Sequence, residues 1–209
     1  MEVTVEYVRV PRDYSYDDRD DFLQDLGYNY DDLMPTLVQI CSKPQSKYES
    51  GLNRDYVIKH FKKDDILIFM RKNGKIIGCC FVDIIDYITI FKDIRDKEGY
   101  IRYSRPIDER FAAVINIFCI TEKKGKVFMA EIEKIILQMA PFAKVSIFLT
   151  PKTKDLQSYY RKYGYKNNNN MSPEGRLGEE ISEEFVKHIG YKSLRKAPRS
   201  SPYIRNVPR

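Results

Sequence analysis

Residues 111–165 read FAAVINIFCITEKKGKVFMAEIEKIILQMAPFAKVSIFLTPKTKDLQSYYRKYGY, and this stretch decides the fold. Its first part, from Ala112 to Ile120, is a near-continuous apolar run with β-branched residues, which is typical of a strand covered on both faces. A helical pattern follows, with apolar residues at positions 128, 132, 135, 136 and 139. Val145, Ile147 and Leu149 then alternate as they would in a second strand. A strand–helix–strand unit of this length favours a right-handed crossover between parallel strands.

A second helix is expected at the end of the stretch. Leu156, Tyr159, Tyr160 and Tyr163 fall at i, i+3, i+4 and i+7, which places them on one helical face. Gly164 follows directly and is placed to end the helix, since glycine is the usual residue just past a helix C-terminus.

The loop between the first strand and the first helix is rich in lysine. Lys123, Lys124 and Lys126 surround Gly125 where the helix should begin. A helix N-terminus carries free N–H groups and a partial positive charge, so three lysines there repel the helix dipole and one another unless an anion binds. Glycine would let the backbone approach that anion. The alternative interpretation is a solvated lysine-rich turn.

In order and spacing, this stretch resembles the GNAT family of N-acetyltransferases. In that family the central strand precedes a loop that binds the pyrophosphate of acetyl-CoA, and a later helix ends in a pattern like F-Y-x-K-x-G-F. The corresponding residues here are YYRKYGY at 159–165, and KIIG at 75–78 is similar to the family's K-I-V-G. The resemblance covers about Asp65 to Tyr165. It implies an α/β fold with a central mixed β-sheet of about six to seven strands flanked by helices. It also implies acetyl-CoA as cosubstrate and no metal.

The resemblance assigns roles to individual residues. The thioester carbonyl would be held by the backbone of Phe118, Cys119 and Ile120, and the cofactor loop would comprise Lys123, Lys124, Gly125, Lys126 and Val127. The family's proton donor to the departing thiolate is the tyrosine four residues before the closing glycine, which is Tyr160 here. The alternative for Tyr160 is a core tyrosine on an apolar helix face.

The general base is less clear from the sequence. Glu109 lies at the start of the central strand, where some family members keep a glutamate, and Asn116 is a candidate to hold a water or a substrate amine. Cys119 without a nearby histidine in the sequence is better explained as a buried structural cysteine than as an acyl carrier.

Composition limits the class of protein. The chain has 209 residues with 43% hydrophobic content and a net charge of +6, which suits one globular domain with a tail. We expect a single GNAT-like domain at 1–194 and a basic, proline-containing tail at 195–209 that is disordered or lies on the surface. Four cysteines without a zinc-binding spacing, of which Cys79 and Cys80 are adjacent, two distant histidines and no 18-residue apolar run predict a cytoplasmic protein in a reducing compartment, without a membrane partner.

The N-terminal part is expected to supply a strand at Val3–Tyr7 and short helices at 17–26, 33–41 and 53–62. Asn73-Gly74 between two apolar runs predicts a hairpin that joins strands at 66–71 and 75–85. Eight aspartates between Asp13 and Asp32 interleave with tyrosines. They form either a solvated acidic face or an acidic, aromatic mouth that attracts a cationic amine.

Three further segments have weaker patterns. Residues 86–110 predict a long loop over the acceptor site. Residues 179–188 predict a helix from Ile181, Phe185 and Ile189 at i, i+4 and i+8, and residues 189–194 predict a last strand.

The sequence therefore predicts an acetyl-CoA-dependent N-acetyltransferase that acts on an amine: a protein lysine, a protein N-terminus or a polyamine-like small molecule. The alternative is a noncatalytic GNAT-like protein that binds acyl-CoA or a partner. Nucleic acid is an unlikely partner on this interpretation, because the N-terminal acids would repel phosphate.

Overall fold

The computed structural model describes residues 2–44, 51–151, 153–167, 185–189 and 204–206. The elements, in chain order, are β1 (Val3–Arg9), α1 (Tyr16–Asp25), α2 (Tyr30–Cys41), α3 (Arg54–Lys63), β2 (Ile66–Lys72), β3 (Lys75–Arg95), β4 (Ile101–Ile120), α4 (Gly125–Met139), β5 (Val145–Leu149), α5 (Lys154–Arg161), β6 (Lys166–Asn167), β7 (Phe185–Ile189) and β8 (Ile204–Asn206).

Eight strands among the described residues form one sheet in the order β6-β7-β5-β4-β3-β2-β1-β8. The sheet is mixed, because β8 pairs with β1 in parallel whereas β1–β2, β2–β3, β5–β7 and β6–β7 are antiparallel. The predicted mixed α/β fold is therefore confirmed, with one strand more than expected, since β8 comes from the tail. β5 lies next to β4, so the β4–α4–β5 segment joins neighbouring strands as the sequence predicts.

The chain divides into two compact units. The first comprises residues 1–84, 115–136 and 197–209, and the second comprises residues 85–114 and 137–196. β3 and β4 each continue from one unit into the other, and each unit is described below by itself.

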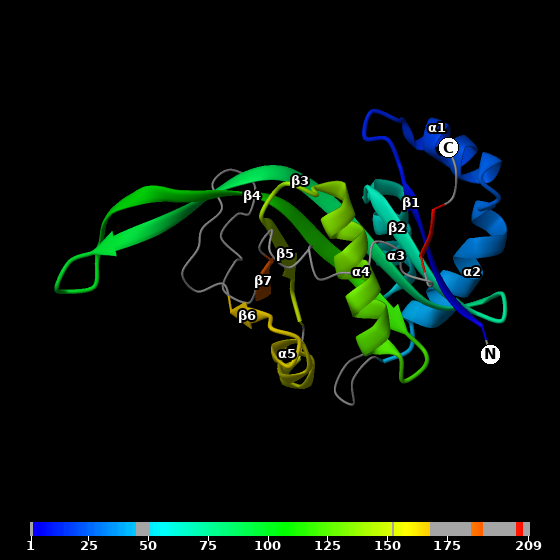
Figure 1. Ribbon diagram of the computed structural model, residues 1–209. Coiled ribbons are helices and arrows are strands. Elements are labelled where there is room, and N and C mark those ends of the chain that lie inside the picture. Colours follow the sequence, from blue (N-terminus) through cyan, green and yellow to red (C-terminus); the bar gives the residue numbers. More distant parts are fainter. Residues whose placement is uncertain (1, 45–50, 152, 168–184, 190–203, 207–209) are drawn as a thin grey trace. The chain divides into compact units, whose positions relative to one another are not determined.

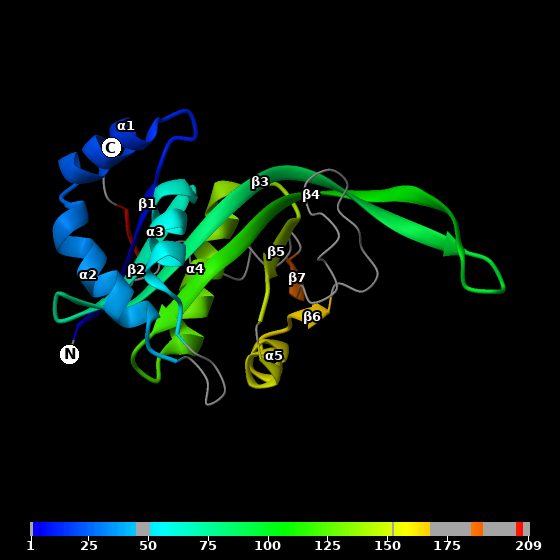
Figure 2. The same cartoon turned by 180° about the vertical axis from the view of Figure 1, so that it is seen from behind.

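The first unit buries both faces of its sheet. Leu67 and Phe69 of β2 pack in a cluster with residues of α1, α2 and α3 such as Leu37 and Phe61. The alternate residues Ile66, Ile68 and Met70 are also fully buried, and none belongs to that cluster. Figure 1 shows α4 over one face of this part of the sheet, and the turned view of Figure 2 shows α2 and α3 over the other. The strands are apolar on both sides for this reason.

The caps of the helices explain much of the acidic N-terminal segment. Ser15 and Asp18 form a reciprocal capping box at the start of α1, and Asn29 accepts hydrogen bonds from the backbone N–H groups of Asp31 and Asp32 at the start of α2. Acids in a first turn also favour the helix dipole. Some acids of this segment therefore serve to stabilise the N-termini of α1 and α2.

The predicted hairpin is confirmed. Asn73 has φ +49° and Gly74 has φ +79°, the left-handed values that a two-residue turn requires at both central positions. The turn joins β2 to β3, which pair from Ile66↔Val82 to Lys72↔Lys75.

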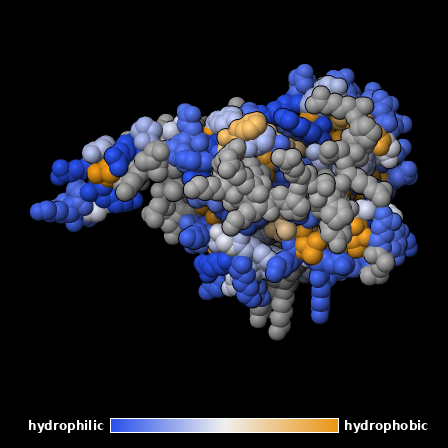
Figure 3. All heavy atoms as spheres, in the orientation of Figure 1, coloured by the Kyte–Doolittle hydropathy of each residue, from blue (hydrophilic) through white to orange (hydrophobic). Residues whose placement is uncertain are grey.

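The prediction of a long loop at 86–110 is wrong. Residues 75–95 and 101–120 are two long strands, joined by a turn in which the Asp96 carboxylate accepts hydrogen bonds from the backbone N–H groups of Glu98 and Tyr100. Both strands are rich in β-branched and aromatic residues, which favour strands. Asp86, Arg95 and Arg102 are exposed, so charged residues of these stretches lie on the solvent side of the strands. Figure 3 shows mostly hydrophilic side chains at the far end of this ribbon.

The C-terminal predictions also need correction. Phe185–Ile189 is strand β7, paired with β5 from Val145↔Ile189 to Leu149↔Phe185, so it is not the end of a helix. Phe185 and Ile189 are four residues apart, a spacing that satisfies both helical and alternating patterns. The remainder of the predicted helix, 179–184, and most of the predicted strand at 189–194 lie outside the described residues. In the tail, Ile204–Asn206 form β8 against β1 at the edge of the sheet.

None of the helices in the described ranges is both long and apolar enough to span a membrane.

Candidate functional site

The lysine-rich loop of the first unit leads from β4 into a helix of 15 residues, α4. The first helical hydrogen bond runs from Phe128 N–H to the Lys124 carbonyl at 3.0 Å. The N–H groups of Gly125, Lys126 and Val127 precede that bond, so they belong to the turn that has no partners within its own helix. Lys123 and Lys126 are exposed and Lys124 is half-buried. Within the described part of the chain, these three lysines form no ion pair with an acid.

The start of this loop is fixed to the β2–β3 hairpin. Both the backbone N–H and the hydroxyl of Thr121 donate to the Ile77 carbonyl, at 2.9 and 3.0 Å. Lys72 Nζ lies 2.7 and 2.9 Å from the two carboxylate oxygens of Glu122. The one acid of the loop is thus directed to the hairpin, and it does not neutralise the lysines at the start of α4.

The end of β4 packs closely against α4 and β3. The rings of Phe118 and Phe128 lie 5.6 Å apart, and Cys119 is only 1% exposed. A Cβ on Gly78 would lie 3.1 Å from the Cys119 carbonyl oxygen and 3.1 Å from the Phe128 ring. Glycine at this position therefore lets β3, the end of β4 and α4 meet, which gives a physical reason for the last residue of the KIIG pattern.

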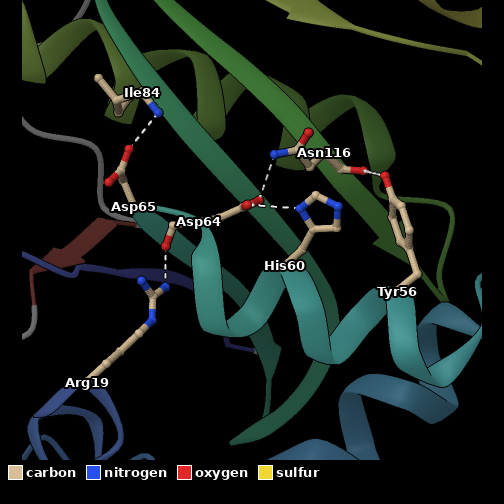
Figure 4. A network of polar contacts seen from close by, with 7 residues as sticks. All are labelled: Arg19, Tyr56, His60, Asp64, Asp65, Ile84 and Asn116. Carbon is tan, nitrogen blue, oxygen red and sulfur yellow. Dashed lines mark hydrogen bonds and ion pairs between the residues drawn. The ribbon is translucent and has the colours of Figure 1, made fainter. Parts of the chain in front are cut away.

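A buried polar network joins the end of α3 to β4 (Figure 4). His60 Nδ1 lies 2.9 Å from Asp64 Oδ1, and the Asn116 amide donates to Asp64 Oδ2 at 3.0 Å. Asp64 is 0% exposed. The Tyr56 hydroxyl makes a long hydrogen bond of 3.5 Å to the Asn116 carbonyl, and its ring lies 4.4 Å from the His60 ring. Asn116 is partly buried and belongs to this network through both its amide and its backbone carbonyl.

Two arginines and two more acids extend the network. Arg19 donates to the Asp64 carbonyl, and burial lowers the pKa of its guanidinium despite the nearby Asp64 and Asp65. Arg12 Nε lies 3.1 Å from Asp65 Oδ1, and Asp65 Oδ2 accepts from the Ile84 N–H at 2.7 Å. Burial is the main cause that raises the pKa of Asp83 to about 6, and a hydrogen bond to Asp65 is the second. Asp83 therefore binds its proton more tightly than an ordinary carboxyl does.

Tyr160 belongs to the second unit. It is 6% exposed, and its ring contacts Tyr159 at 5.3 Å and Tyr165 at 5.8 Å, both edge-to-face. Its carbonyl accepts from the N–H groups of Tyr163 and Tyr165 at the end of α5, where Gly164 has φ +87°. The predicted glycine stop is confirmed, although α5 itself is Lys154–Arg161. The role of Tyr160 as a proton donor stays a prediction.

Glu109 also belongs to the second unit and has an exposed side chain on β4. Its neighbour Asp108 is held by Lys144 at 2.7 Å and by Arg110 at 2.9 Å. The structure thus does not gather the predicted site residues in one unit: Asn116, Phe118–Ile120 and Lys123–Val127 lie in the first, and Glu109 and Tyr160 lie in the second.

None of the four cysteines forms a disulfide bond, all four are buried, and Cys41 Sγ lies 3.4 Å from Cys79 Sγ. Burial raises the pKa of Cys80 well above that of an ordinary thiol, which suits structural cysteines. In the described ranges, no group of three or more histidine, cysteine, aspartate and glutamate side chains could hold a metal ion.

No protein-family model and no curated protein matches the sequence. Several solved structures are similar to the fold. A single-residue mutant of the AtaT toxin is 12% identical, with 92% of each chain covered and a TM-score of 0.49. AtaTR bound with AcCoA is 9% identical over 92% of this chain and 96% of its own, with a TM-score of 0.48. Ard1 from Thermoplasma volcanium is 11% identical over 90% of this chain and 96% of its own, with a TM-score of 0.43. At these identities and TM-scores, the similarity assigns no function to this chain.

Sequence reasoning missed His60 and Asp64 as site residues. Their i, i+4 spacing at the end of an expected helix was the available signal, because residues so spaced lie side by side on a helix. No local pattern linked either residue to Asn116, which lies 52 residues further along the chain from Asp64.

Proposed function

We propose that this protein is an acetyl-CoA-dependent N-acetyltransferase that moves an acetyl group to an amine by direct attack. The observation that carries the proposal is the sequence β4, lysine loop, α4: three lysines stand at the N-terminus of a 15-residue helix, and none of them pairs with an acid of the described chain. Such a site suits the pyrophosphate of acetyl-CoA, since helix N–H groups and lysines both favour phosphate oxygens. The motif resemblance of residues 65–165 supports the same cofactor.

In this proposal the neutral amine attacks the thioester carbonyl, the C–N bond forms and the C–S bond breaks. The backbone of Phe118–Ile120 holds the thioester, and the loop residues Lys123–Val127 bind the cofactor phosphates. Tyr160 gives its phenolic proton to the departing thiolate, which suits a group that stays neutral and protonated near pH 7. Positioning of the two reactants and this proton transfer are the main sources of rate. The acceptor is a protein lysine, a protein N-terminus or a polyamine-like amine.

The first test measures the binding of acetyl-CoA through the rise in melting temperature that it causes. A ligand that binds only the native state adds RT ln(1 + [L]/Kd), or roughly 2.7 kcal/mol at a hundredfold excess over Kd. Lys124→Glu with Lys126→Glu should remove most of the shift. Lys75→Glu with Lys97→Glu is the matched control, since both are exposed lysines outside the loop, Lys75 at the start of β3 and Lys97 in the turn between β3 and β4.

The absence of a melting shift for the wild type at millimolar acetyl-CoA would refute cofactor binding. An oligonucleotide is the second ligand in this assay, because a lysine-rich helix N-terminus also attracts nucleic-acid phosphate. A shift with the oligonucleotide alone would replace the proposed function with nucleic-acid binding.

The second test is turnover by Tyr160→Phe, which keeps the ring contacts with Tyr159 and Tyr165 but removes the proton. We expect unchanged melting and acetyl-CoA binding and a kcat lower by about 10²–10⁴-fold, the usual worth of a general acid. Tyr159→Phe on the same helix is the control and should retain most of the activity. Full turnover by Tyr160→Phe would show that Tyr160 is a packing residue. A wild type that binds acetyl-CoA but acetylates no amine in a panel would favour the noncatalytic acyl-CoA-binding alternative.

A further inference from the structure

The His60–Asp64 pair has the geometry of an oriented base. Asp64 Oδ1 lies 2.9 Å from His60 Nδ1, and the second carboxylate oxygen accepts from Asn116 at 3.0 Å. An ionised carboxylate only accepts hydrogen bonds, so Nδ1 must carry the proton in this contact. In the neutral imidazole, the lone pair then lies on Nε2. The network therefore selects the tautomer in which Nε2 can accept a proton.

The pair is held rigidly at the end of α3. Asp64 is the C-cap of the helix, and its backbone N–H donates to the His60 carbonyl at 2.9 Å. The Arg19 guanidinium donates to the backbone carbonyl of Asp64. The Asp64 side chain is 1% exposed, and that of His60 keeps 10% of its surface exposed. A carboxylate this deeply buried is costly unless its hydrogen bonds are satisfied, and here both oxygens are engaged. Of the two side chains, the imidazole is the one that retains access to the outside of the network.

The pair is also tied to β4 close to the proposed thioester site. Asp64 and Tyr56 both contact Asn116, one through its amide and the other through its carbonyl. Asn116 precedes Phe118 by two residues, which is about 7 Å along a strand. Through Asp64 and Tyr56, the imidazole is therefore linked to a residue of β4 that lies two positions before the backbone proposed to hold the thioester. All of these residues belong to the first unit.

We propose that His60 is the general base of the acetyl transfer and that Asp64 is its positioning residue, an inference that rests on the proposed N-acetyltransferase function. As the amine nitrogen bonds to the acetyl carbon, its proton passes to His60 Nε2. The electron pair of the broken C–S bond leaves with the CoA sulfur, which takes a proton from Tyr160. Solvent then removes the proton from His60 and restores the one on Tyr160, so the reaction balances without a further reactant.

The charged and titratable groups of the network around this pair come from several elements: Tyr56 on α3, Arg19 on α1, Asp64 and Asp65 just before β2, and Asp83 on β3. For this reason the test uses a ratio of rates in addition to a single pH profile.

The first experiment reads the tautomer directly in the resting protein. The sequence has two histidines, so histidine-selective ¹⁵N labelling gives two ring systems, and His188 serves as the internal reference. We expect His60 to show a protonated Nδ1 and an unprotonated Nε2 at about pH 7.5, and we expect this preference to weaken in Asp64→Asn. A protonated Nε2 in the wild type would overturn the proposal without reference to activity.

The second experiment compares kcat/KM of the wild type and His60→Gln across about pH 5.5 to 9. Both proteins use the same acceptor amine, so the pH dependence that comes from ionisation of the amine is the same for both and cancels in the ratio of their kcat/KM values. We expect this ratio to be about 10²–10⁴ near neutral pH and to fall toward acidic pH, where a histidine base is protonated. His188→Gln should leave the profile unchanged. Melting shifts with acetyl-CoA should be the same in all three proteins.

The outcomes separate this proposal from the one on which it rests. If the wild type fails to acetylate any amine, both are overturned. If the wild type turns over and His60→Gln keeps its rate and profile, only the role of His60 is overturned. If His60→Gln does not fold, Asp64→Asn decides: the wild-type rate and profile in that variant would overturn the positioning role.

Discussion

Asp83 is the residue where the structure makes a clear pH prediction. Burial and the hydrogen bond with Asp65 raise its pKa to about 6, with further repulsion from Asp64. The unfolded chain would release this proton at an ordinary aspartate pKa, about 3.9. Between these values the folded state holds more protons than the unfolded state, so the free energy of unfolding falls as pH rises from about 4 to 6. Above about pH 6 the ionised carboxylate weakens the fold.

Asp83→Asn should therefore stabilise the protein at about pH 7. The amide keeps a donor toward Asp65 but cannot ionise, and we expect a gain of about 1 kcal/mol, a modest value because the side chain is only half-buried. The advantage should vanish near pH 4, where wild-type Asp83 is largely protonated when folded and about half protonated when unfolded. Urea unfolding of both proteins at about pH 4, 5.5 and 7 measures this directly. A constant difference across these pH values would contradict the raised pKa.

At the residue scale, the sequence singled out Asn116 but did not predict its contacts. Asn116 was expected to hold a polar group because it interrupts an apolar strand, and its partner is Asp64. Nothing in the sequence indicates that partner, since hydrogen bonds between distant segments depend on how strands pair. The charged network of Arg12, Arg19 and Asp65 is unpredictable for the same reason.

At the element scale, local signals succeeded where one residue type has few conformations. Asn73-Gly74 predicted the turn of the β2–β3 hairpin, and Gly164 predicted the end of the α5 segment; all three residues have positive φ in the structure. The β3–β4 ribbon was missed because its exposed, charged residues resemble those of a loop, and strand pairing rather than composition defines it. β7 was mistaken for part of a helix because its buried ends also fit helical spacing. Tertiary pairing decided both cases.

The packing of α4 on the sheet depends on Gly78. Its φ is not left-handed, so alanine would not strain the backbone, but the added methyl would lie 3.1 Å from both the Cys119 carbonyl oxygen and the Phe128 ring. Overpacking of this kind typically costs about 1–3 kcal/mol. We expect Gly78→Ala to lose about that much stability in urea unfolding. It should also weaken acetyl-CoA binding, because the end of β4 and the start of α4 must shift.

A double-mutant cycle tests this explanation. A third close atom is Ile120 Cγ1, at 3.3 Å from the added methyl. Phe128→Leu removes the ring from one of the three close contacts, so Gly78→Ala should cost less in that background than in the wild type, with a coupling energy above about 0.5 kcal/mol. Additive effects of the two substitutions would mean that the methyl is accommodated without displacing α4.

At the scale of the whole molecule, charge is unevenly distributed along the chain. Net charge is +6, yet residues 13–32 contain eight aspartates. The structure assigns Asp18, Asp31 and Asp32 to helix N-termini and places Asp20 3.7 Å from Lys62. Asp17, Asp21 and Asp25 are exposed. The tyrosines of the segment divide as well: Tyr28 is buried and Tyr30 packs on Phe61, whereas Tyr14 and Tyr16 are exposed.

If this acidic surface draws in cationic acceptors, kcat/KM for a polyamine should fall as salt rises, because the Debye length shortens from about 10 Å at 0.1 M to about 3 Å at 1 M. Asp21→Asn with Asp25→Asn should flatten the salt dependence. These two acids lie beyond the first turn of α1, so they do not interact favourably with the helix dipole as acids in the first turn do. The variant should therefore fold at least as well as the wild type. An uncharged amine acceptor is the control and should show little salt dependence in either protein. Equal salt dependence for the polyamine and the uncharged amine would mean that the acidic segment serves the helices and not the substrate.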